Sequence, residues 1–344
     1  MAVTRVLVVD DSFLMRRIIS DIISSDPDME VVGKAKDGQE ALDKAYSLKP
    51  DVITLDINLP GKDGIEILQE LMHKQPTRVI MLSAYTRSGA TATIKALELG
   101  AVDFIAKPSG EISLGLEKLK SEIVSKIKLA AKVDLDKYIA SFTPRGREPV
   151  GELPGLKKLV IIGASTGGPR AVLDIMKDVP GDLPASFLIV QHMPKGFTLS
   201  FAERIAWQSG VKTKEAEEGD VIMPCRCLVA PAGFHLVLER DGDQVRVHLN
   251  QDPLVNFVRP SIDVTMLSAA EIFGRHIVGV ILTGMGKDGM EGARCIKQRG
   301  GMVIVQDEES SVVWGMPRSV VKEGYADLVL PLSRISGELM HLVR

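Results

Sequence analysis

The stretch KKLVIIGASTGGPRAVLDIM, residues 157–176, decides the fold of the second half of the chain. It joins an apolar run, typical of a buried strand, to a helical pattern through a turn of small residues. Strand–turn–helix units of this kind build parallel sheets that carry helices on both faces. The glycine-rich turn therefore either cradles a phosphate or holds a nucleophilic serine at the end of a strand.

The residues of the turn favour the nucleophile. The turn lacks both G-x-x-x-x-G-K-[ST] and G-x-G-x-x-G, so only a looser phosphate cradle at the helix start remains open. Residues 163–167, GASTG, satisfy G-x-S-x-G directly after a strand, which is the setting of a nucleophile elbow. A serine at a helix start is also a common cap, so Ser165 needs a base to support this interpretation.

Histidine is the usual base for a serine, and the chain has six. His192 follows the apolar run ASFLIVQ, which predicts that it lies on the same sheet edge as Ser165, whereas His235 begins a hairpin strand and is a poorer candidate. The carboxylate that orients the imidazole is Asp288 or Asp307, since both follow predicted strands. The glycines around Asp288 favour it, and the order Ser…His…Asp differs from that of α/β-hydrolases.

The pattern around this turn predicts a doubly wound, Rossmann-like α/β domain over residues 157–344. Its predicted parallel strands are residues 157–163, 185–191, 276–284, 301–307 and 326–330. Residues 234–249 alternate around Asp241-Gly242-Asp243, which predicts an antiparallel hairpin inserted in the domain.

The first half of the chain, residues 1–130, shows a second alternation of strands and helices. Its predicted strands are residues 5–9, 29–35, 51–55, 78–84 and 101–108, which form a parallel sheet with right-handed crossovers. Between the halves, residues 131–156 contain several prolines and glycines that interrupt any period, so we predict a linker there.

Polar residues follow the predicted strands of the first half. Asp10 and Asp11 follow the first strand, Asp56 ends the third, and Ser83 and Lys107 end the fourth and fifth. Because sites in such sheets form at the carboxyl ends of the strands, these side chains are expected to meet. Three carboxylates suit Mg²⁺, and with the lysine they suit transfer of a phosphoryl group to a carboxylate.

Composition limits the class of protein. Hydrophobic content of 45% with 25% charged residues is typical of a globular protein, and 344 residues fit two domains. A net charge of -3 gives no reason to expect nucleic-acid binding. The apolar runs fall short of a signal peptide or of the roughly 18 residues of a membrane span, so we expect a cytoplasmic protein without membrane insertion.

Residues 1 to about 125 resemble a response-regulator receiver domain through VLVVDDS, DVITLDINLPGKDG, VIMLSA and DFIAKP. The resemblance implies a flavodoxin-like fold, Asp56 as phosphoacceptor, and Mg²⁺ held by Asp10, Asp11 and Asp56. It further implies that Ser83 and Lys107 contact the phosphoryl group and that Phe104 occupies the position of a switching aromatic. A buried strand phenylalanine is the alternative interpretation of Phe104.

Residues 157–344 resemble the catalytic domain of the chemotaxis protein-glutamate methylesterases, the CheB family, through IGASTGGP, VQHMP, APAGFHLVL and ILTGMGKDG. The resemblance implies Ser165 as nucleophile, His192 as base and Asp288 as its orienter, and it demotes Asp307. It also implies that the N–H of Met285 binds the oxyanion, and the elbow geometry adds the N–H of Thr166.

The two resemblances together imply a function. They imply a phosphorylation-activated serine hydrolase of two-component signalling that removes methyl groups from glutamate esters of chemoreceptors, without a cofactor for the hydrolysis. A chemotaxis histidine kinase is the implied phosphodonor, and deamidation of receptor glutamines stays open. A phosphorylation-controlled binding protein and an esterase for a small metabolite are the alternative hypotheses.

Overall fold

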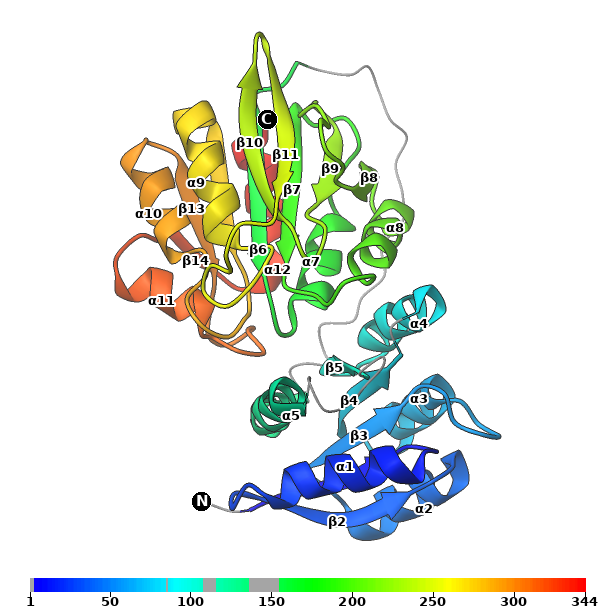
Figure 1. The fold of residues 1–344 in the computed structure, drawn as a ribbon. Helices are drawn as coiled ribbons and strands as arrows, with labels where there is room; N and C mark the ends of the chain where they lie inside the picture. Colours follow the sequence, from blue (N-terminus) through cyan, green and yellow to red (C-terminus); the bar gives the residue numbers. More distant parts are fainter. Residues whose placement is uncertain (1–2, 85, 108–115, 136–154) are drawn as a thin grey trace. The chain divides into compact units, whose positions relative to one another are not determined.

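The computed structural model describes residues 3–84, 86–107, 116–135 and 155–344. The chain divides into two compact units, Met1–Ser141 and Phe142–Arg344, each of which is described by itself. Most of the predicted linker, residues 136–154, lies outside the described residues, so the predicted domain boundaries stay predictions. The predicted class, α/β with two parallel-sheet domains, is confirmed (Figure 1).

The first unit is a five-stranded parallel sheet between two layers of helices. Its strands are β1 (Thr4–Val9), β2 (Met29–Ala35), β3 (Val52–Asp56), β4 (Arg78–Ser83) and β5 (Asp103–Ala106). Its helices are α1 (Phe13–Ser24), α2 (Gly38–Leu48), α3 (Gly64–Lys74), α4 (Arg87–Glu98) and α5 (Leu116–Ala130). The strand order is β2-β1-β3-β4-β5, and α1 packs beside α5 while α3 packs between α2 and α4.

The second unit is built on a seven-stranded parallel sheet with a two-stranded hairpin. Its strands are β6 (Lys158–Ala164), β7 (Ala185–Gln191), β8 (Lys212–Glu215), β9 (Arg226–Val229), β10 (His235–Asp241), β11 (Gln244–Asn250), β12 (Ile277–Ile281), β13 (Met302–Gln306) and β14 (Leu328–Leu330). Its helices are α7 (Gly168–Met176), α8 (Thr198–Gln208), α9 (Ile262–Phe273), the 3₁₀ helix η2 (Gly274–His276), α10 (Met290–Gln298), α11 (Met316–Lys322) and α12 (Leu332–Val343). The order of the large sheet is β14-β13-β12-β6-β7-β9-β8.

The large sheet has two strands that the sequence does not predict. β8 and β9 are short, and β8 has the sequence KTKE at the exposed edge of the sheet. Charged edge strands resist pairing with other chains but carry no apolar signal, and a four-residue strand is too short for periodicity to reveal. The predicted hairpin is confirmed, since β10 pairs antiparallel with β11.

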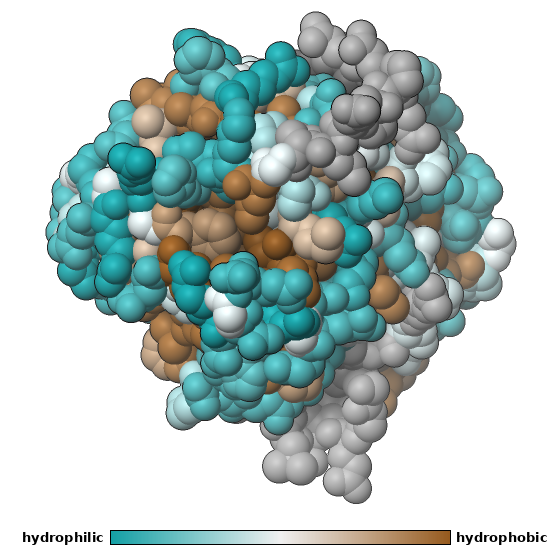
Figure 2. All heavy atoms as spheres, turned by 90° about the horizontal axis from the view of Figure 1, so that it is seen from above, coloured by the Kyte–Doolittle hydropathy of each residue, from teal (hydrophilic) through white to brown (hydrophobic). Residues whose placement is uncertain are grey.

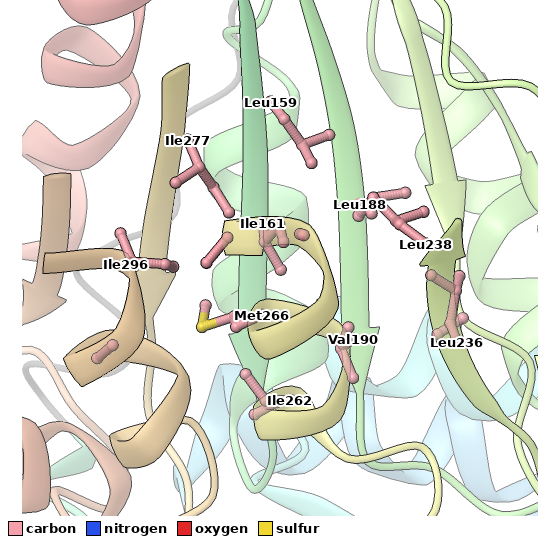
Figure 3. Close-up of a cluster of buried hydrophobic side chains, with 14 of the residues drawn as sticks. Leu159, Ile161, Leu188, Val190, Leu236, Leu238, Ile262, Met266, Ile277 and Ile296 are labelled. Atoms are coloured by element: carbon pink, nitrogen blue, oxygen red, sulfur yellow. The ribbon is translucent and has the colours of Figure 1, made fainter. Parts of the chain in front are cut away.

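Packed against one face of the large sheet are α9, α10 and the hairpin. Figure 3 shows Ile262 and Met266 of α9 among the apolar side chains between this helix and the sheet, with Leu236 of the hairpin at one side. A Cβ added to Gly163 of β6 would lie 2.6 Å from Ile262 Cγ2, so the glycine makes room for the first turn of α9. This packing fixes the N-terminus of α9 beside the end of β6.

Both sheets have one point at which the strand order reverses. In the first unit β1 lies beside β3, and in the second β6 lies between β7 and β12. In open α/β sheets, ligands bind in the crevice beyond the carboxyl ends of the strands at such a point. Asp10 follows β1 and Asp56 ends β3, while Ser165 follows β6 and Asp288 follows β12.

On the face seen from above in Figure 2, hydrophilic side chains predominate and hydrophobic side chains gather in patches. Among the described residues, no helix combines the length and the apolar character that crossing a bilayer requires.

Candidate active site and phosphoryl site

Ser165 lies in the tight turn between β6 and α7. Its N–H donates to Thr283 O at 3.0 Å, which ties the turn to the end of the neighbouring strand β12, and its own carbonyl accepts from Gly168 N–H at 2.7 Å. Gly167 has a φ of 75°, a left-handed conformation that glycine adopts without strain. A Cβ on Gly284 would lie 2.7 Å from Ser165 Cβ, so the serine sits against a bare backbone.

His192 follows β7, the next strand of the sheet, and pairs with Asp288. Its backbone N–H donates to Ala164 O at 3.0 Å, and its Nε2 lies 2.8 Å from Asp288 Oδ2. Within the described part of the chain, neither Nδ1 of His192 nor Oγ of Ser165 has a hydrogen-bond partner. Nδ1 is therefore the ring nitrogen left to accept a proton.

Asp288 is held at the N-terminus of α9 by four further donors. Its Oδ1 accepts from Ser261 Oγ at 2.6 Å, Asn256 Nδ2 at 3.0 Å and Asp263 N–H at 3.2 Å, and its Oδ2 accepts from Ile262 N–H at 2.7 Å. No side-chain hydrogen bond from its own N-cap residue closes α9, so the carboxylate of a different segment caps this helix. The positive end of the helix dipole favours the ionised form.

The pKa values of two buried carboxyl groups near His192, those of Asp288 and Asp263, shift in opposite directions. Burial opposes ionisation of Asp288, but the hydrogen bond and charge of His192, with the bonds from Ser261 and Ile262, lower its pKa below the usual range. Burial raises the pKa of Asp263, and the charge of Asp288 raises it further against the bond from Gly292. Asp288 is therefore the more readily ionised of the two, and a carboxylate in that state beside His192 suits stabilisation of a charged imidazole.

The two alternative candidates, Asp307 and His235, make contacts of a different kind. Asp307 accepts from the N–H and the hydroxyl of Ser310, at 3.0 and 2.6 Å, and so closes its own turn. His235 is buried, with Nε2 3.1 Å from Pro253 O and Nδ1 accepting from Ser261 N–H at 3.2 Å. Both residues hold loops, whereas Asp288 meets His192.

Two backbone donors predicted for an oxyanion lie in the segments that flank Ser165. In the described part of the chain, the N–H groups of Thr166 and Met285 have no hydrogen-bond partner. Met285 belongs to the turn after β12, where Gly284 adjoins Ser165, and its side chain is 56% exposed. Unpaired donors at such a turn suit a negatively charged oxygen.

Two groups of residues near the site were missed by the sequence interpretation. Gln191 is buried at the end of β7, and its Nε2 donates to the carbonyls of Ser165 at 2.9 Å and His192 at 3.1 Å, so it joins the two segments. A polar residue that ends an apolar strand is the one signal for it. The second group, Asn256 and the first turn of α9, approaches Asp288 only through tertiary packing.

Three acidic side chains of the first unit lie close together at the ends of β1 and β3. One carboxylate oxygen each from Asp10, Asp11 and Asp56 lies within 4.8 Å of the others. Carboxylate oxygens are the ligands that Mg²⁺ prefers in proteins, so the chemistry of this donor set fits that ion. Lys107 Nζ lies 2.8 Å from Asp10 Oδ2 and 2.6 Å from Asp56 Oδ2.

The other predicted residues of the first unit are buried, some of them beside the acidic site and one in the core of the unit. Burial raises the pKa of Asp56 to about 6, although the Lys107 ammonium lowers it. Ser83 is buried at the end of β4, with its hydroxyl 3.1 Å from Gly89 O. Phe104 is buried in β5 with Lys126 Nζ 5.0 Å from its ring centroid, and its switching role stays a prediction.

Comparison with known proteins gives relatives for both units. Residues 160–339 match the family described as CheB methylesterase, and residues 6–117 match the response regulator receiver domain. A protein-glutamate methylesterase/protein-glutamine glutaminase of Thermotoga maritima is 49% identical over 99% of both chains, and one of Pyrococcus abyssi is 46% identical over 98% of this chain and 93% of its own. The crystal structure of the Thermotoga maritima CheB methylesterase catalytic domain is similar with a TM-score of 0.54 and 46% identity, covering 56% of this chain and all of that one.

Proposed function

The chain belongs to the CheB methylesterase family, and on that premise we propose that it hydrolyses the γ-methyl esters of glutamate residues in chemoreceptors. The observation that carries the proposal is the His192–Asp288 pair at 2.8 Å, placed at the strand ends that flank Ser165. The products are methanol and a receptor carboxylate. The names of the relatives also support hydrolysis of glutamine amides.

In the first half of the reaction, Ser165 Oγ attacks the ester carbonyl carbon. His192 Nδ1 takes the hydroxyl proton, and the imidazolium that results donates its Nε2–H to the ionised Asp288. The carbonyl oxygen becomes negatively charged and accepts from the N–H groups of Thr166 and Met285. Collapse of this intermediate breaks the bond to the methoxy group, which leaves as methanol with the proton from His192.

In the second half, water replaces the serine on the acyl group. His192 Nδ1 removes a proton from water, whose oxygen bonds to the acyl carbon, and then returns a proton to Ser165 Oγ as that bond breaks. The two backbone donors hold the same oxyanion again. Asp288 keeps one imidazole orientation through both halves because its other bonds fix the carboxylate to α9.

We propose that the first unit controls this reaction through phosphorylation of Asp56. Asp10, Asp11 and Asp56 would hold Mg²⁺, which neutralises charge on a transferring phosphoryl group when bound. Lys107 places a positive charge against the acceptor oxygen, and a chemotaxis histidine kinase supplies the phosphoryl group. The protein is proposed to act in the cytoplasm, where the methylated helices of chemoreceptors lie.

The test is methanol release from receptor membranes that carry labelled methyl esters, with Mg²⁺ and with or without a small phosphodonor. Release is expected to rise with the phosphodonor and to fall by about 10³-fold or more in Ser165→Ala. Ser333→Ala removes an exposed hydroxyl from α12 and serves as the matched control with normal release. Undiminished release by Ser165→Ala would contradict the proposed nucleophile.

A further inference from the structure

The loop that precedes α9 contains a turn in an unfavourable conformation. Val258 N–H donates to Val255 O at 3.0 Å, and the two central residues, Asn256 and Phe257, have φ values of 52° and 65°. Positive φ at both positions is the signature of a type I′ turn, which favours Asn at the first position and Gly at the second. A bulky residue is rare in that conformation and is strained by it, so Phe257 stands where glycine would be preferred.

The turn is fixed to the active site. His235 bonds Pro253 O with one ring nitrogen and Ser261 N–H with the other, so one buried imidazole joins both ends of the loop. Asn256 Nδ2 donates to Asp263 Oδ2 at 2.9 Å and to Asp288 Oδ1 at 3.0 Å. The position of Phe257 relative to the His192–Asp288 pair is therefore set by hydrogen bonds.

The aromatic ring of Phe257 contributes nothing to the core of its own unit. It is 95% exposed, and Leu254 of the same loop is 56% exposed. Single exposed apolar residues are common on proteins, but here the exposed ring also carries a conformational cost that glycine would remove. A strained, exposed aromatic residue next to a residue that bonds a catalytic carboxylate is typical of a ligand contact.

We propose that Phe257 is a substrate-contacting residue that selects esters carried on a protein, by packing against apolar side chains beside the esterified glutamate. The inference rests on the proposed methylesterase function. A glutamyl ester by itself offers few atoms for recognition, so selection of a protein substrate requires contact outside the reacting group. Aromatic residues provide such contacts at low conformational cost because only two side-chain angles must be fixed.

The experiment compares Phe257→Gly with wild type in methanol release from esterified receptor membranes. Glycine removes the ring and relieves the turn, so we expect KM to rise by about ten-fold or more, kcat to stay within about two-fold, and thermal stability to be equal or higher. The separate variant Phe257→Tyr keeps the aromatic ring and is expected to have the KM of the wild-type protein. Lys49→Gly, which relieves a left-handed residue with a φ of 47° at the end of α2, is the matched control with unchanged kinetics.

Binding is measured separately in the Ser165→Ala background, where the ester stays intact. Adding Phe257→Gly is expected to weaken binding to the esterified membranes by about the same factor as the rise in KM. An unchanged KM, or a loss confined to kcat, would overturn the inference and leave the proposed function standing. Absence of methanol release by the wild-type protein would overturn both.

Discussion

Replacement of Asp288 by asparagine tests the geometry of the site most directly, because the change keeps the shape of the side chain and removes one acceptor. The carboxylate Oδ1 accepts from three groups and Oδ2 from two, of which one is His192 Nε2. An amide nitrogen cannot accept a hydrogen bond, so whichever oxygen it replaces will face donors.

Of the two orientations of the new side-chain amide, the one with the lower free-energy cost is the one that abolishes catalysis. An amide nitrogen in place of Oδ1 leaves two donors without this acceptor, the N–H of Asp263 and one N–H of the Asn256 amide, which costs about 2–6 kcal/mol. In place of Oδ2 it leaves only the N–H of Ile262 unpaired, about 1–3 kcal/mol, if His192 turns Nε2 into an acceptor. Nδ1 then carries the proton and cannot act as the base, so kcat is expected to fall by about 10³–10⁴-fold.

The assay is methanol release together with thermal unfolding of Asp288→Asn. A loss of about 1–3 kcal/mol predicts a melting temperature roughly 2–12 °C lower for a unit of this size. Asp307→Asn is the matched control, because both of its bonds from Ser310 fall on the one oxygen that the amide retains. Asp288→Asn with kcat within ten-fold of wild type would refute the tautomer argument.

Two further predictions concern the sites at the points where the strand order of each sheet reverses. Mg²⁺ affinity measured by calorimetry should fall about ten-fold between pH 7.5 and pH 5, because Asp56, with a pKa of about 6, is protonated below that value and must lose its proton to bind the ion. The dependence should vanish in Asp56→Asn, and its persistence there would assign it to another group. Gly284→Ala should lower kcat more than ten-fold in the methanol assay, since its Cβ would lie 2.7 Å from Ser165 Cβ. Gly337→Ala, whose Cβ would meet no atom within 4 Å in α12, should keep full activity, and equal kinetics of the two variants would contradict the argument from close approach.

The order and type of most elements follow from periodicity, because buried parallel strands read as apolar runs. The runs at residues 157–163 and 185–191 correspond to β6 and β7, and the ends of these two runs are enough to predict Ser165 and His192 on one edge of the sheet. β8 and β9 were missed because an exposed edge strand and a four-residue strand carry no such run.

The partners of Asp288 could not be predicted, since they depend on how segments far apart in the chain pack. Asn256 and Ser261 lie 32 and 27 residues away from Asp288 in sequence, and neither belongs to a motif that signals the contact. The choice between Asp288 and Asp307 was open from the residues alone for the same reason. Glycines suggested close approach, but only the packing of Ile262 against Gly163 places α9 beside the imidazole.

Main-chain amides hold part of the Asp288 carboxylate in place, so its position does not depend on the side chains that select the substrate. Two of its donors, the N–H groups of Ile262 and Asp263, belong to the backbone, so only proline at these positions would delete them. Exposed side chains of the preceding loop can therefore be replaced without loss of the hydrogen bonds that these main-chain amides donate to Asp288. An engineered enzyme for a different esterified protein would vary residues 254 and 257 and leave residues 261–263 unchanged.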